Sequence, residues 1–464
     1  MTVPTSDPEA GVRTARPRPA RRALDDLSLP VDASLVEALA SASPDWLAAD
    51  RRAAFAAWSE LPAESNLLYT PYIDLRAARL EGARVVTEPT ASTPAAATLP
   101  GDTDALVEIV EGWPTAAILS EAARAAGLVV RPLPDALEAA RDLLASPGLP
   151  ATDKFAQLTR ALWTQGVVVD VPAGVVLERP IVVRWIIDAP DRALFTRTLV
   201  RLGDGASASL VEELVGAPAA TAPKPAGQTL FAGTTEVTLG AGASLQVASL
   251  QELPGHVVAL QHRTASIGEG AALQWALAQL GGRLVRSRVD NRLVGDRSSV
   301  EQVEIVFGAD EQLFDLTSYT THIGRDTTGD LLSKAALLER ARTYLKGLIV
   351  IDKSAIGTDS FLGEFGMNLS KQARSVAIPS LEIDQPDCRR AAHSSSVGPV
   401  DETQLFYLES RGIPPDEARK FIVLGFLEPV VARVPLASAR DRLRELLEAK
   451  WTAGTDGVTG EAAA

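Results

Sequence analysis

The residues with the most reactive side chains gather in one short stretch, DQPDCRRAAHSSSVG. It contains the only cysteine of the chain, Cys388, together with His393, Asp384 and Asp387. A thiolate, an imidazole and carboxylates this close in sequence can ligate a metal ion or an iron–sulfur cluster. Such residue types also occur together on loops that bind no metal, so the pattern by itself does not rank them. We take His393 as the candidate ligand and Cys388 as a weaker candidate.

A second motif, residues 203–208 with the sequence GDGASA, matches the G-x-G-x-x-A pattern of dinucleotide-binding loops. Such a site needs a helix directly after the loop, because the helix N-terminus holds the pyrophosphate. The sequence that follows, SLVEELVG, has no helix-length pattern and leads into an Ala/Pro-rich stretch. The motif therefore predicts a structural corner and no nucleotide site. No Walker A loop, HExxH or Cys-x-x-Cys motif is present.

Pairs of carboxylates raise the possibility of a polysaccharide-active enzyme. Glu212 and Glu213 form one pair, and Asp401 and Glu402 form another. Two carboxylates flank the scissile bond in most glycosidases, and many solenoids of β-strands act on glycans. Solvated charge is the simpler interpretation of both pairs, and only 5% of the residues are aromatic, which leaves few rings for stacking on sugars.

The other histidines, His256, His262 and His322, lie in or beside strand-like segments. We interpret them as hydrogen-bonding residues of the strands.

Composition sets the limits of function. The chain has 464 residues, 46% of them hydrophobic and 22% charged, with a net charge of −14. A negative chain with pI near 5.0 is not expected to bind nucleic acid non-specifically. No apolar run is long enough for a membrane span, and no signal-peptide h-region is found, so we expect a cytoplasmic protein. A single cysteine excludes an intramolecular disulfide and fits a reducing compartment.

Hydrophobic periodicity divides the chain into five segments. Residues 1–25, rich in Pro and Arg, indicate a disordered arm, with a transit peptide as the less favoured interpretation. Residues 26–165 show mostly helical spacing, whereas residues 166–400 alternate with the period of strands. Residues 401–452 return to a helical period, and residues 453–464 indicate a frayed tail.

The strand region repeats its turns. Near copies of one corner sequence occur at Gly203, Gly240 and Gly268, with a weaker copy at Gly295. Glycine permits tight corners and close stacking of neighbouring turns. A loose period near 28 residues with two or three strands per unit predicts a solenoid of stacked β-coils. A β-sandwich is the alternative, although a sandwich gives no reason for the corner to recur.

Four pieces of the sequence resemble the SufB/SufD family of iron–sulfur cluster assembly proteins, and together they cover about residues 153–435. They are ALWTQGVVVDVPAGVVLERPIVV, TSYTTHIGRDTTGDLLSKAALLERARTYLKGLIVI, SLEIDQPD and HSSSVGPVDETQLFYLESRGIPPDEARKFIVLGFLEPV. The resemblance implies a mainly β protein: a right-handed parallel β-helix core flanked by helical N- and C-terminal regions. It also implies a complex with a SufB-like paralogue and a SufC-like ABC ATPase, in which the strand domains of the two paralogues pair.

Within the family the sequence is more similar to SufD than to SufB. SufB-like proteins carry a glutamate after the histidine, where this chain has Ser394, and Cys388 is offset from the SufB cysteine position. The resemblance therefore implies a non-catalytic scaffold subunit whose His393 contributes at the interface with SufB. It implies no cofactor bound stably by the chain alone, a transient iron–sulfur cluster in the complex, and leaves a flavin in the complex open. A self-sufficient SufB-like scaffold is the alternative, and a polysaccharide-active solenoid is the less favoured one.

Docking of the ATPase falls, by the same resemblance, to the C-terminal helical region at residues 401–452. Apolar residues there lie on more than one side of the expected helices, which suits a partner as well as packing onto the end of the solenoid. The candidate docking residues are Leu405, Phe406, Phe421, Leu424 and Phe426.

Overall fold

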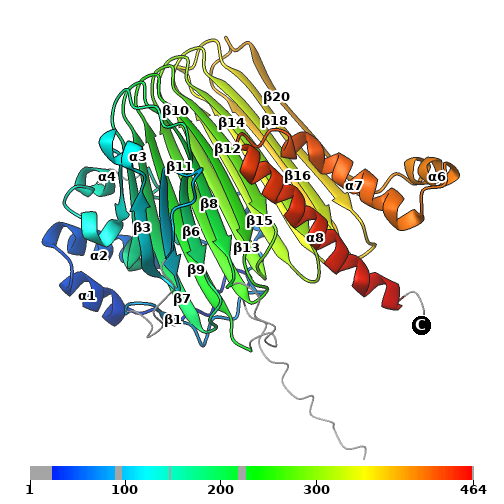
Figure 1. Cartoon of the computed structure of the whole chain (residues 1–464), viewed down its shortest axis with the longest axis horizontal. Helices are drawn as coiled ribbons and strands as arrows, with labels where there is room; N and C mark the ends of the chain where they lie inside the picture. Colours follow the sequence, from blue (N-terminus) through cyan, green and yellow to red (C-terminus); the bar gives the residue numbers. More distant parts are fainter. Residues whose placement is uncertain (1–22, 89–96, 146–147, 218–225, 462–464) are drawn as a thin grey trace, which may run out of the picture.

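The computed structural model describes residues 23–88, 97–145, 148–217 and 226–461, with side chains described up to residue 453. Residues 1–22 of the expected N-terminal arm lie outside this part. Two long sheets face each other and together form one tapering body (Figure 1). We call them sheet A, which takes most odd-numbered strands, and sheet B, which takes most even-numbered strands.

Sheet A and sheet B are built alternately as the chain advances. Each coil adds one strand to each sheet, and neighbouring strands within a sheet run parallel. In sheet A the coil strands are β5 (Gln165–Val171), β7 (Arg192–Leu202), β9 (Thr229–Leu239), β11 (Val257–Ile267), β13 (Leu284–Leu293), β15 (Leu313–His322), β17 (Arg342–Ile351) and β19 (Arg374–Ile383). In sheet B they are β6 (Ile181–Ile186), β8 (Ser207–Val215), β10 (Ser244–Glu252), β12 (Ala272–Gln279), β14 (Ser299–Gly308), β16 (Thr328–Leu337), β18 (Asp359–Asn368) and β20 (Arg390–Pro399).

This architecture is a β-solenoid of about eight coils, with helices at both ends of the chain. The solenoid prediction is confirmed and the β-sandwich alternative is wrong. Each coil holds two strands, and the Gln246 amide, for example, donates to Gln274 28 residues later on the next coil. Each inner strand has a neighbouring strand on both sides, so its backbone N–H and C=O groups are hydrogen-bonded. Only the strands at the two ends of each sheet have a free edge.

The repeated corner explains the glycines. Gly205, Gly242 and Gly270 take φ of +65°, +65° and +62°, and Arg297 keeps the same conformation at +59° in the weaker fourth copy. A Cβ at Gly268 would lie 2.6 Å from the Leu239 carbonyl oxygen of the coil below. The first glycine of the motif is therefore required by close stacking, and the second by the left-handed turn.

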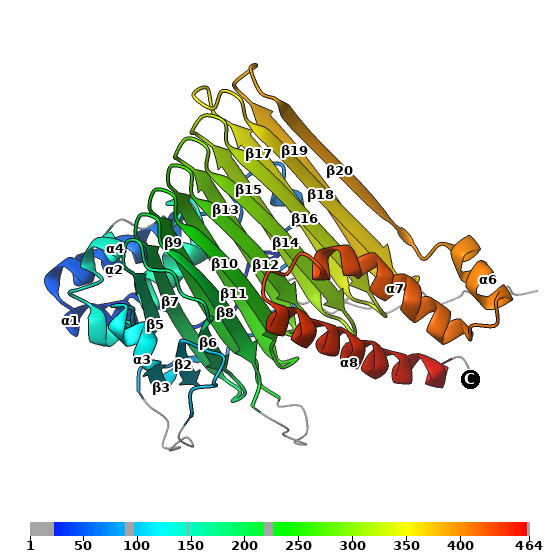
Figure 2. The same ribbon diagram turned by 45° about the horizontal axis from the view of Figure 1, so that its top comes forward.

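The N-terminal region covers the outer face of sheet A (Figures 1 and 2). Its helices bury aliphatic and aromatic residues against strands β7, β9 and β11, and its strands extend the two sheets at their first coils. The elements are α1 (Ala33–Ser41), α2 (Asp45–Glu60), η1 (Thr70–Tyr72), β1 (Arg84–Val85), β2 (Ala105–Val110), β3 (Trp113–Leu119), α3 (Glu121–Ala125), β4 (Val129–Pro132), η2 (Leu133–Ala136), α4 (Arg141–Ala145) and α5 (Lys154–Leu162).

The C-terminal helices α6 (Glu402–Ser410), α7 (Pro415–Val431) and α8 (Ala437–Glu461) lie along sheet B. Helices α7 and α8 bury an apolar face on the outer side of that sheet. Three cationic side chains connect the helices to the sheet. Lys334 donates to the Phe426 carbonyl at 2.6 Å, and Lys450 donates to the Gln312 side chain at 2.8 Å. Arg433 pairs with Glu301 and Asp330, both at 2.6 Å. The two long helices are thus part of the fold, and α8 continues into the segment that the sequence marks as a tail.

Candidate functional site

The last coil leaves both sheets open. Strand β19 ends sheet A and strand β20 ends sheet B, and neither has a strand on its outer side within the described residues. Side chains of β20 are mostly exposed, whereas those of β18 beneath it are all buried or partly buried. Figure 2 shows β19 and β20 at the free margin of the molecule. Unpaired N–H and C=O groups in such a row are a template for another strand.

His393 lies on β20 at this open margin. It pairs in register with Leu362 of β18, which is buried in a small apolar cluster inside the last coils. Paired residues of neighbouring strands share a face of the sheet, so His393 occupies the inward side of β20. The side chain is exposed only because no further coil covers it. An imidazole in this place is free to take a ligand supplied from outside the chain.

Cys388 lies in the loop that joins β19 to β20. It is half-buried and packs against the apolar cluster that contains Leu362 and Ile351. Near it, the backbone N–H of Asp384 and the carbonyl of Asp387 make ordinary coil-to-coil hydrogen bonds, to Ile351 and Gly357. Within the residues that the structure describes, no three His, Cys, Asp or Glu side chains come close enough to hold a metal ion. The ligand types that are close in sequence therefore do not form a complete site in one chain.

Glu364, which the sequence analysis did not single out, lies directly below this margin. Its side chain is 2% exposed, and its Oε2 accepts a hydrogen bond of 3.0 Å from the backbone N–H of Ile378 on β19. Burial raises the pKa of Glu364 to about 8. The signal that could have found it is the strand alternation of FLGEFGMN, in which this glutamate falls at an inward position.

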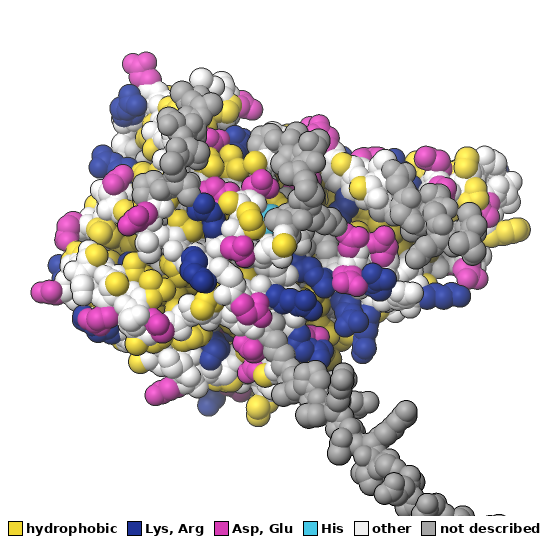
Figure 3. All heavy atoms as spheres, turned by 90° about the horizontal axis from the view of Figure 1, so that it is seen from below, with side chains coloured by type: hydrophobic (Ala, Val, Ile, Leu, Met, Phe, Trp, Pro, Cys, Tyr) yellow, Lys and Arg dark blue, Asp and Glu magenta, His cyan; other side chains and the backbone are white. Residues whose placement is uncertain are grey.

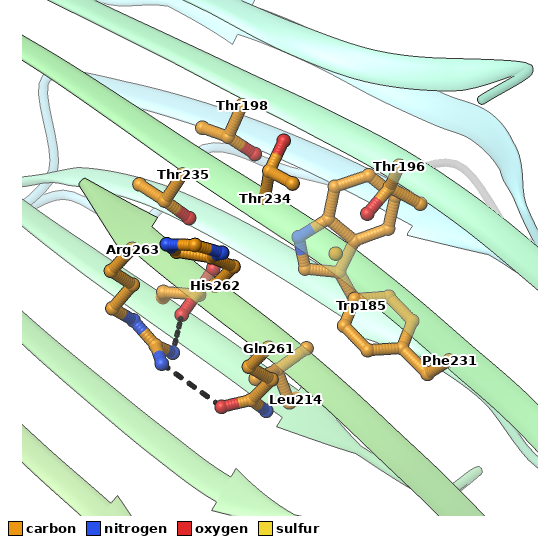
Figure 4. Close-up of a pocket in the computed structure, with 12 residues that line it drawn as sticks. Trp185, Thr196, Thr198, Leu214, Phe231, Thr234, Thr235, Gln261, His262 and Arg263 are labelled. Atoms are coloured by element: carbon orange, nitrogen blue, oxygen red, sulfur yellow. Dashed lines mark hydrogen bonds and ion pairs between the residues drawn. The ribbon is translucent and has the colours of Figure 1, made fainter. Parts of the chain in front are cut away.

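The middle of the solenoid holds buried polar side chains instead of an open pocket. The Arg263 guanidinium donates to Glu212 at 2.7 Å, to Ser249 at 2.8 Å and to Gln261 at 3.0 Å; Figure 4 shows Arg263 turned towards Gln261. The cavity beside them has a volume of about 10 Å³, which is room for one water molecule. It cannot admit a sugar.

The carboxylate pair weighed for glycan hydrolysis is separated by the sheet. Glu212 faces inward and is bound to Arg263, whereas Glu213 faces outward and pairs with Arg184 at 2.6 Å. Asp401 caps helix α6, where its carboxylate accepts from the backbone N–H of Thr403 at 2.8 Å. These contacts give the carboxylates structural roles and do not suit a pair that flanks a glycosidic bond.

Two of the other histidines are hydrogen-bonded inside the fold, as expected. His262 lies 2.6 Å from Asp290 and 3.6 Å from Asp153; burial lowers its pKa, but the bonds to the two carboxylates outweigh burial and raise it. His322 contacts Thr327 at 2.8 Å and Ser360 at 3.1 Å, and burial lowers its pKa to about 4.

The His256 ring is half-buried, and its Nε2 has no hydrogen-bond partner among the described residues. Burial lowers the pKa of this histidine.

A helical arm stands apart from the solenoid. Helix α6 has no buried residue, and Phe406 and Tyr407 on it are 70% and 56% exposed, as is Phe421 on α7 at 58%. A mainly apolar groove of about 420 Å³ runs between α6 and α7; it is lined by Asp401, Thr403, Gln404, Tyr407, Leu408 and Ile422. Figure 3 shows hydrophobic side chains at the far end of this arm.

The predicted docking residues divide into two groups by their position. Phe406 and Phe421 are exposed on the arm, and Leu405 is partly buried in α6. Leu424 and Phe426 instead pack towards sheet B, and the Phe426 ring lies 4.6 Å from the Lys334 ammonium. The geometry thus places the accessible part of the surface on α6 and the start of α7.

Comparison with known proteins identifies the family. Residues 185–426 match the family model described as SUF system FeS cluster assembly, SufBD core domain. This chain belongs to the SufBD family. It is 30% identical over 298 residues to the iron–sulfur cluster assembly protein SufD of Bacillus subtilis, which covers 64% of this chain and 67% of that protein. It is 28% identical over 299 residues to a SufBD family protein of Staphylococcus epidermidis, where the match covers 63% of the relative.

The family places the protein in iron–sulfur cluster assembly, and one of the relatives it resembles is a SufD protein. The family match ends within α7, so it includes the open margin with His393 and most of the helical arm. Separately, none of the helices in the described residues is long and apolar enough to cross a membrane.

Proposed function

We propose that this protein is a SufD-like, non-catalytic subunit of a cytoplasmic scaffold complex that assembles iron–sulfur clusters. The observation that carries the proposal is the open last coil, in which β19 and β20 present unpaired edges beside His393. A long open edge on an otherwise closed solenoid is an aggregation hazard unless another chain covers it. A SufB-like paralogue with a solenoid of its own supplies strands of matching length and spacing.

The composition of the margin supports pairing with a folded partner. Strand β20 presents Ala and Ser, with Val397 as an exposed apolar side chain, and β19 adds Ile383. Small side chains permit close approach of a second sheet, and the backbone groups then provide the affinity by strand addition. His393 lies inside such an interface, where water is excluded and a nascent cluster can form between the two chains.

The helical arm is the proposed docking surface for a SufC-like ABC ATPase. Its exposed aromatic residues, Phe406, Tyr407 and Phe421, border a groove of about 420 Å³. Aromatic anchors beside a concave surface are the usual centre of a protein–protein contact. Because α6 is joined to the body through α7, movement of a bound ATPase would be transmitted to sheet B and from there to the open margin.

The chain by itself is proposed to bind no cofactor stably, with the cluster as a transient cargo of the complex. It has one thiol, and the described residues bring no three metal-binding side chains together. A flavin, if the complex uses one, would bind to surfaces that form only on assembly.

Co-expression with the SufB-like paralogue and the ABC ATPase of the same host tests the proposal. We expect a complex of all three chains under anaerobic conditions, measured by size-exclusion chromatography with light scattering and by mass spectrometry. The variant Phe406→Asp should lose the ATPase and keep the paralogue. Leu405 is not substituted in this variant, because it is partly buried. Failure of wild-type chain to bind either partner would reject the proposal; stable cluster assembly on the isolated chain would favour a SufB-like scaffold.

A further inference from the structure

One outward row of sheet A changes its chemistry at the last two strands. In register, Leu284 of β13 pairs with Leu313 of β15, Leu313 with Arg342 of β17, and Arg342 with Arg374 of β19. The two leucines are buried beneath the N-terminal region, whereas both arginines are exposed. The row therefore becomes cationic where the N-terminal region no longer covers it, at the open margin of the sheet.

The two arginines form no ion pair of their own within the described residues. The carboxylate of Asp74 lies 2.9 Å from the Arg76 guanidinium. The hydrogen bond from Arg76 lowers the pKa of Asp74, and the charge of Arg342 adds to this effect, so one carboxylate is shared by two arginines. Like charges directly opposite each other on neighbouring strands, as Arg342 and Arg374 are, destabilise a sheet unless an anion lies against them.

Further cations surround this end of the two strands. Arg340 and Lys371 are exposed on the segments that lead into β17 and β19. Arg340 shares the Glu311 carboxylate with Arg283, at 3.0 and 3.2 Å. Figure 3 views the molecule from this end of the strands and shows Lys and Arg side chains close together. In a chain with a net charge of −14, a local excess of cations favours an anionic partner at this place.

An aromatic pair lies beside the arginines. The ring centroids of Tyr344 on β17 and Tyr72 on η1 are 5.9 Å apart, and both side chains are partly exposed. Burial is the main cause of the raised pKa of Tyr344, and the charges of Arg374 and Arg342 oppose it, so both guanidinium groups act on this ring from nearby. Tyrosine and arginine are the residue types that protein–protein contacts favour. This corner thus has the composition of an interface as well as the charge.

The place of the arginines on a free edge indicates which anion they bind. A strand that a partner adds to β19 would continue the row, so that one of its side chains would lie directly beside Arg374. A carboxylate there accepts two parallel hydrogen bonds from a guanidinium group, which gives the contact a direction as well as a charge. Nucleic acid fits less well, because the net charge of −14 repels it and its phosphates offer no strand to pair with β19.

We infer that Arg342 and Arg374 bind an acidic segment of the partner chain that covers the open margin, with Tyr72 and Tyr344 supporting it. The identity of that partner, a SufB-like paralogue, rests on the proposed function. Backbone groups repeat along an edge, so strand addition by itself leaves the register open. Carboxylates held at the start of β19 fix which end of the partner lies there, and the charge raises the rate of association.

Charge reversal tests the inference on the full chain. The test variant combines Arg342→Glu with Arg374→Glu. The matched control combines Arg325→Glu with Lys353→Glu, which makes the same change in net charge at exposed positions where the strands of sheet A end. The signal is the rate at which labelled paralogue associates, at low and at high salt. Urea denaturation of each isolated variant should match wild type, because all four side chains are exposed.

We expect the test variant to associate at least about tenfold more slowly than wild type at low salt, and to lose the fall in rate that high salt produces in wild type. The control should stay within about twofold of wild type. A control that slows as much as the test variant would overturn the inference, because the effect would then come from net charge and not from this corner.

A photo-crosslinking aromatic residue in place of Tyr344 identifies the segment that is bound. We expect the crosslinked peptide to come from the paralogue and to contain Asp or Glu, and a change of that acidic residue to Arg should restore the association of the Arg374→Glu chain. Crosslinking to a second copy of this chain, to nucleic acid or to a paralogue peptide without a carboxylate would reject the inference.

The proposed function and this inference fail in different ways. A test variant that binds the paralogue with the rate and affinity of wild type rejects the acidic contact and leaves the pairing of the two chains in place. A wild-type chain that binds no paralogue rejects the pairing, and the contact with it.

Discussion

The two ends of the solenoid finish in different ways. At the first coils, β3 and β4 add antiparallel strands to sheets B and A, and the N-terminal helices pack over sheet A. At the last coil, β19 and β20 finish as parallel strands with free edges. Strands β3 and β4 are also edge strands, but β3 is half-buried along most of its length, whereas β20 is mostly exposed. We call the first end closed in this sense, because a covered edge is a poorer template for strand addition. The comparison therefore assigns stability to the first coils and partner binding to the last.

Buried charge divides by its surroundings instead of by the end of the solenoid. Between sheet A and the N-terminal helices, charged side chains are paired: Arg197 makes two bonds of 2.8 Å to Glu236, and Asp153 contacts Arg286 and Arg288 at 3.1 and 3.0 Å. Inside the later coils, the carboxyls of Glu304 and Glu364 lack such partners. The ion pairs stabilise one arrangement of the helices on the sheet. Buried carboxyls without an ion-pair partner, such as those of Glu304 and Glu364, are more typical of functional sites.

The largest effect is expected beneath the N-terminal helices, from Asp153→Ala, because this carboxylate joins α5 to β13. Burial alone would raise the pKa of Asp153, but Arg286 and Arg288 hold it well below its ordinary value. Removing it leaves Arg288 paired with Asp290 alone and Arg286 with only the distant Glu64, at 3.9 Å. Breaking a buried network in this way costs about 3–5 kcal/mol of unfolding free energy. Urea denaturation of the isolated chain measures this loss.

The control for that variant is Asp32→Ala, which removes an N-cap on the exposed helix α1, where the Asp32 carboxylate accepts from Leu35 at 3.0 Å. A lost cap costs about 1 kcal/mol. If the two variants destabilise the protein equally, the buried network contributes nothing beyond the cap that Asp153 also provides to α5.

A pH-dependent effect separates the unpaired carboxyls from the paired ones. Burial raises the pKa of Glu304 from 4.5 to about 7. Between these values the folded protein holds a proton that the unfolded chain has released, so the contribution of Glu304 to stability falls as pH rises from 4.5 to about 7. The slope is at most about 1.4 kcal/mol per pH unit. Glu304→Gln should therefore remove this part of the pH dependence.

The measurement is the difference in unfolding free energy between Glu304→Gln and wild type at pH 5 and at pH 8. We expect the unfolding free energy of Glu304→Gln, relative to that of wild type, to be about 1–3 kcal/mol higher at pH 8 than at pH 5. A difference that is the same at both pH values would contradict the raised pKa. Comparing variants cancels the other titrating groups, such as His322.

Much of the fold can be predicted from sequence because its cause is local. The corner glycines at 203, 240 and 268 require stacked turns, and the alternation of the strands requires a buried face. The candidate site is different. His393 is found by residue type and family resemblance, but Glu364 becomes notable only through its register with Ser395 and its bond to Ile378, which join segments that are far apart along the chain. Strand register and burial are tertiary facts that the local pattern does not contain.

The C-terminal helices show the same limit in another form. Apolar residues on several sides of residues 401–452 suited both docking and packing, and sequence could not separate the two. The structure separates them residue by residue, because Phe426 contacts Lys334 and Phe406 is exposed.

A lysine substitution on one edge strand at a time tests which end of sheet B binds the paralogue. Val397→Lys places a charge on β20 at the open margin, and Ala117→Lys places one on β3, the edge strand at the closed end of the same sheet. We expect Val397→Lys to weaken binding of the SufB-like paralogue at least tenfold, about 1.4 kcal/mol, because a desolvated charge opposes strand addition.

Both edge variants should keep wild-type stability, since both positions are exposed in the isolated chain. Fluorescence-detected titration of labelled paralogue measures the affinity. Equal weakening by Ala117→Lys would place the interface at the closed end and reverse the comparison.

The smallest effect is expected from the ion pair that joins the last two coils of sheet B. Arg390 lies 2.7 Å from Asp359, and both side chains are largely exposed. Exposed pairs contribute about 0–1 kcal/mol, and salt screens them. Arg390→Ala should therefore lower the unfolding free energy by less than 1 kcal/mol, and by less still in high salt. A loss as large as that of Asp153→Ala would mean that the open end stabilises the fold as strongly as the buried network beneath the N-terminal helices does, so the margin would then be a structural terminus instead of a surface kept available for a partner.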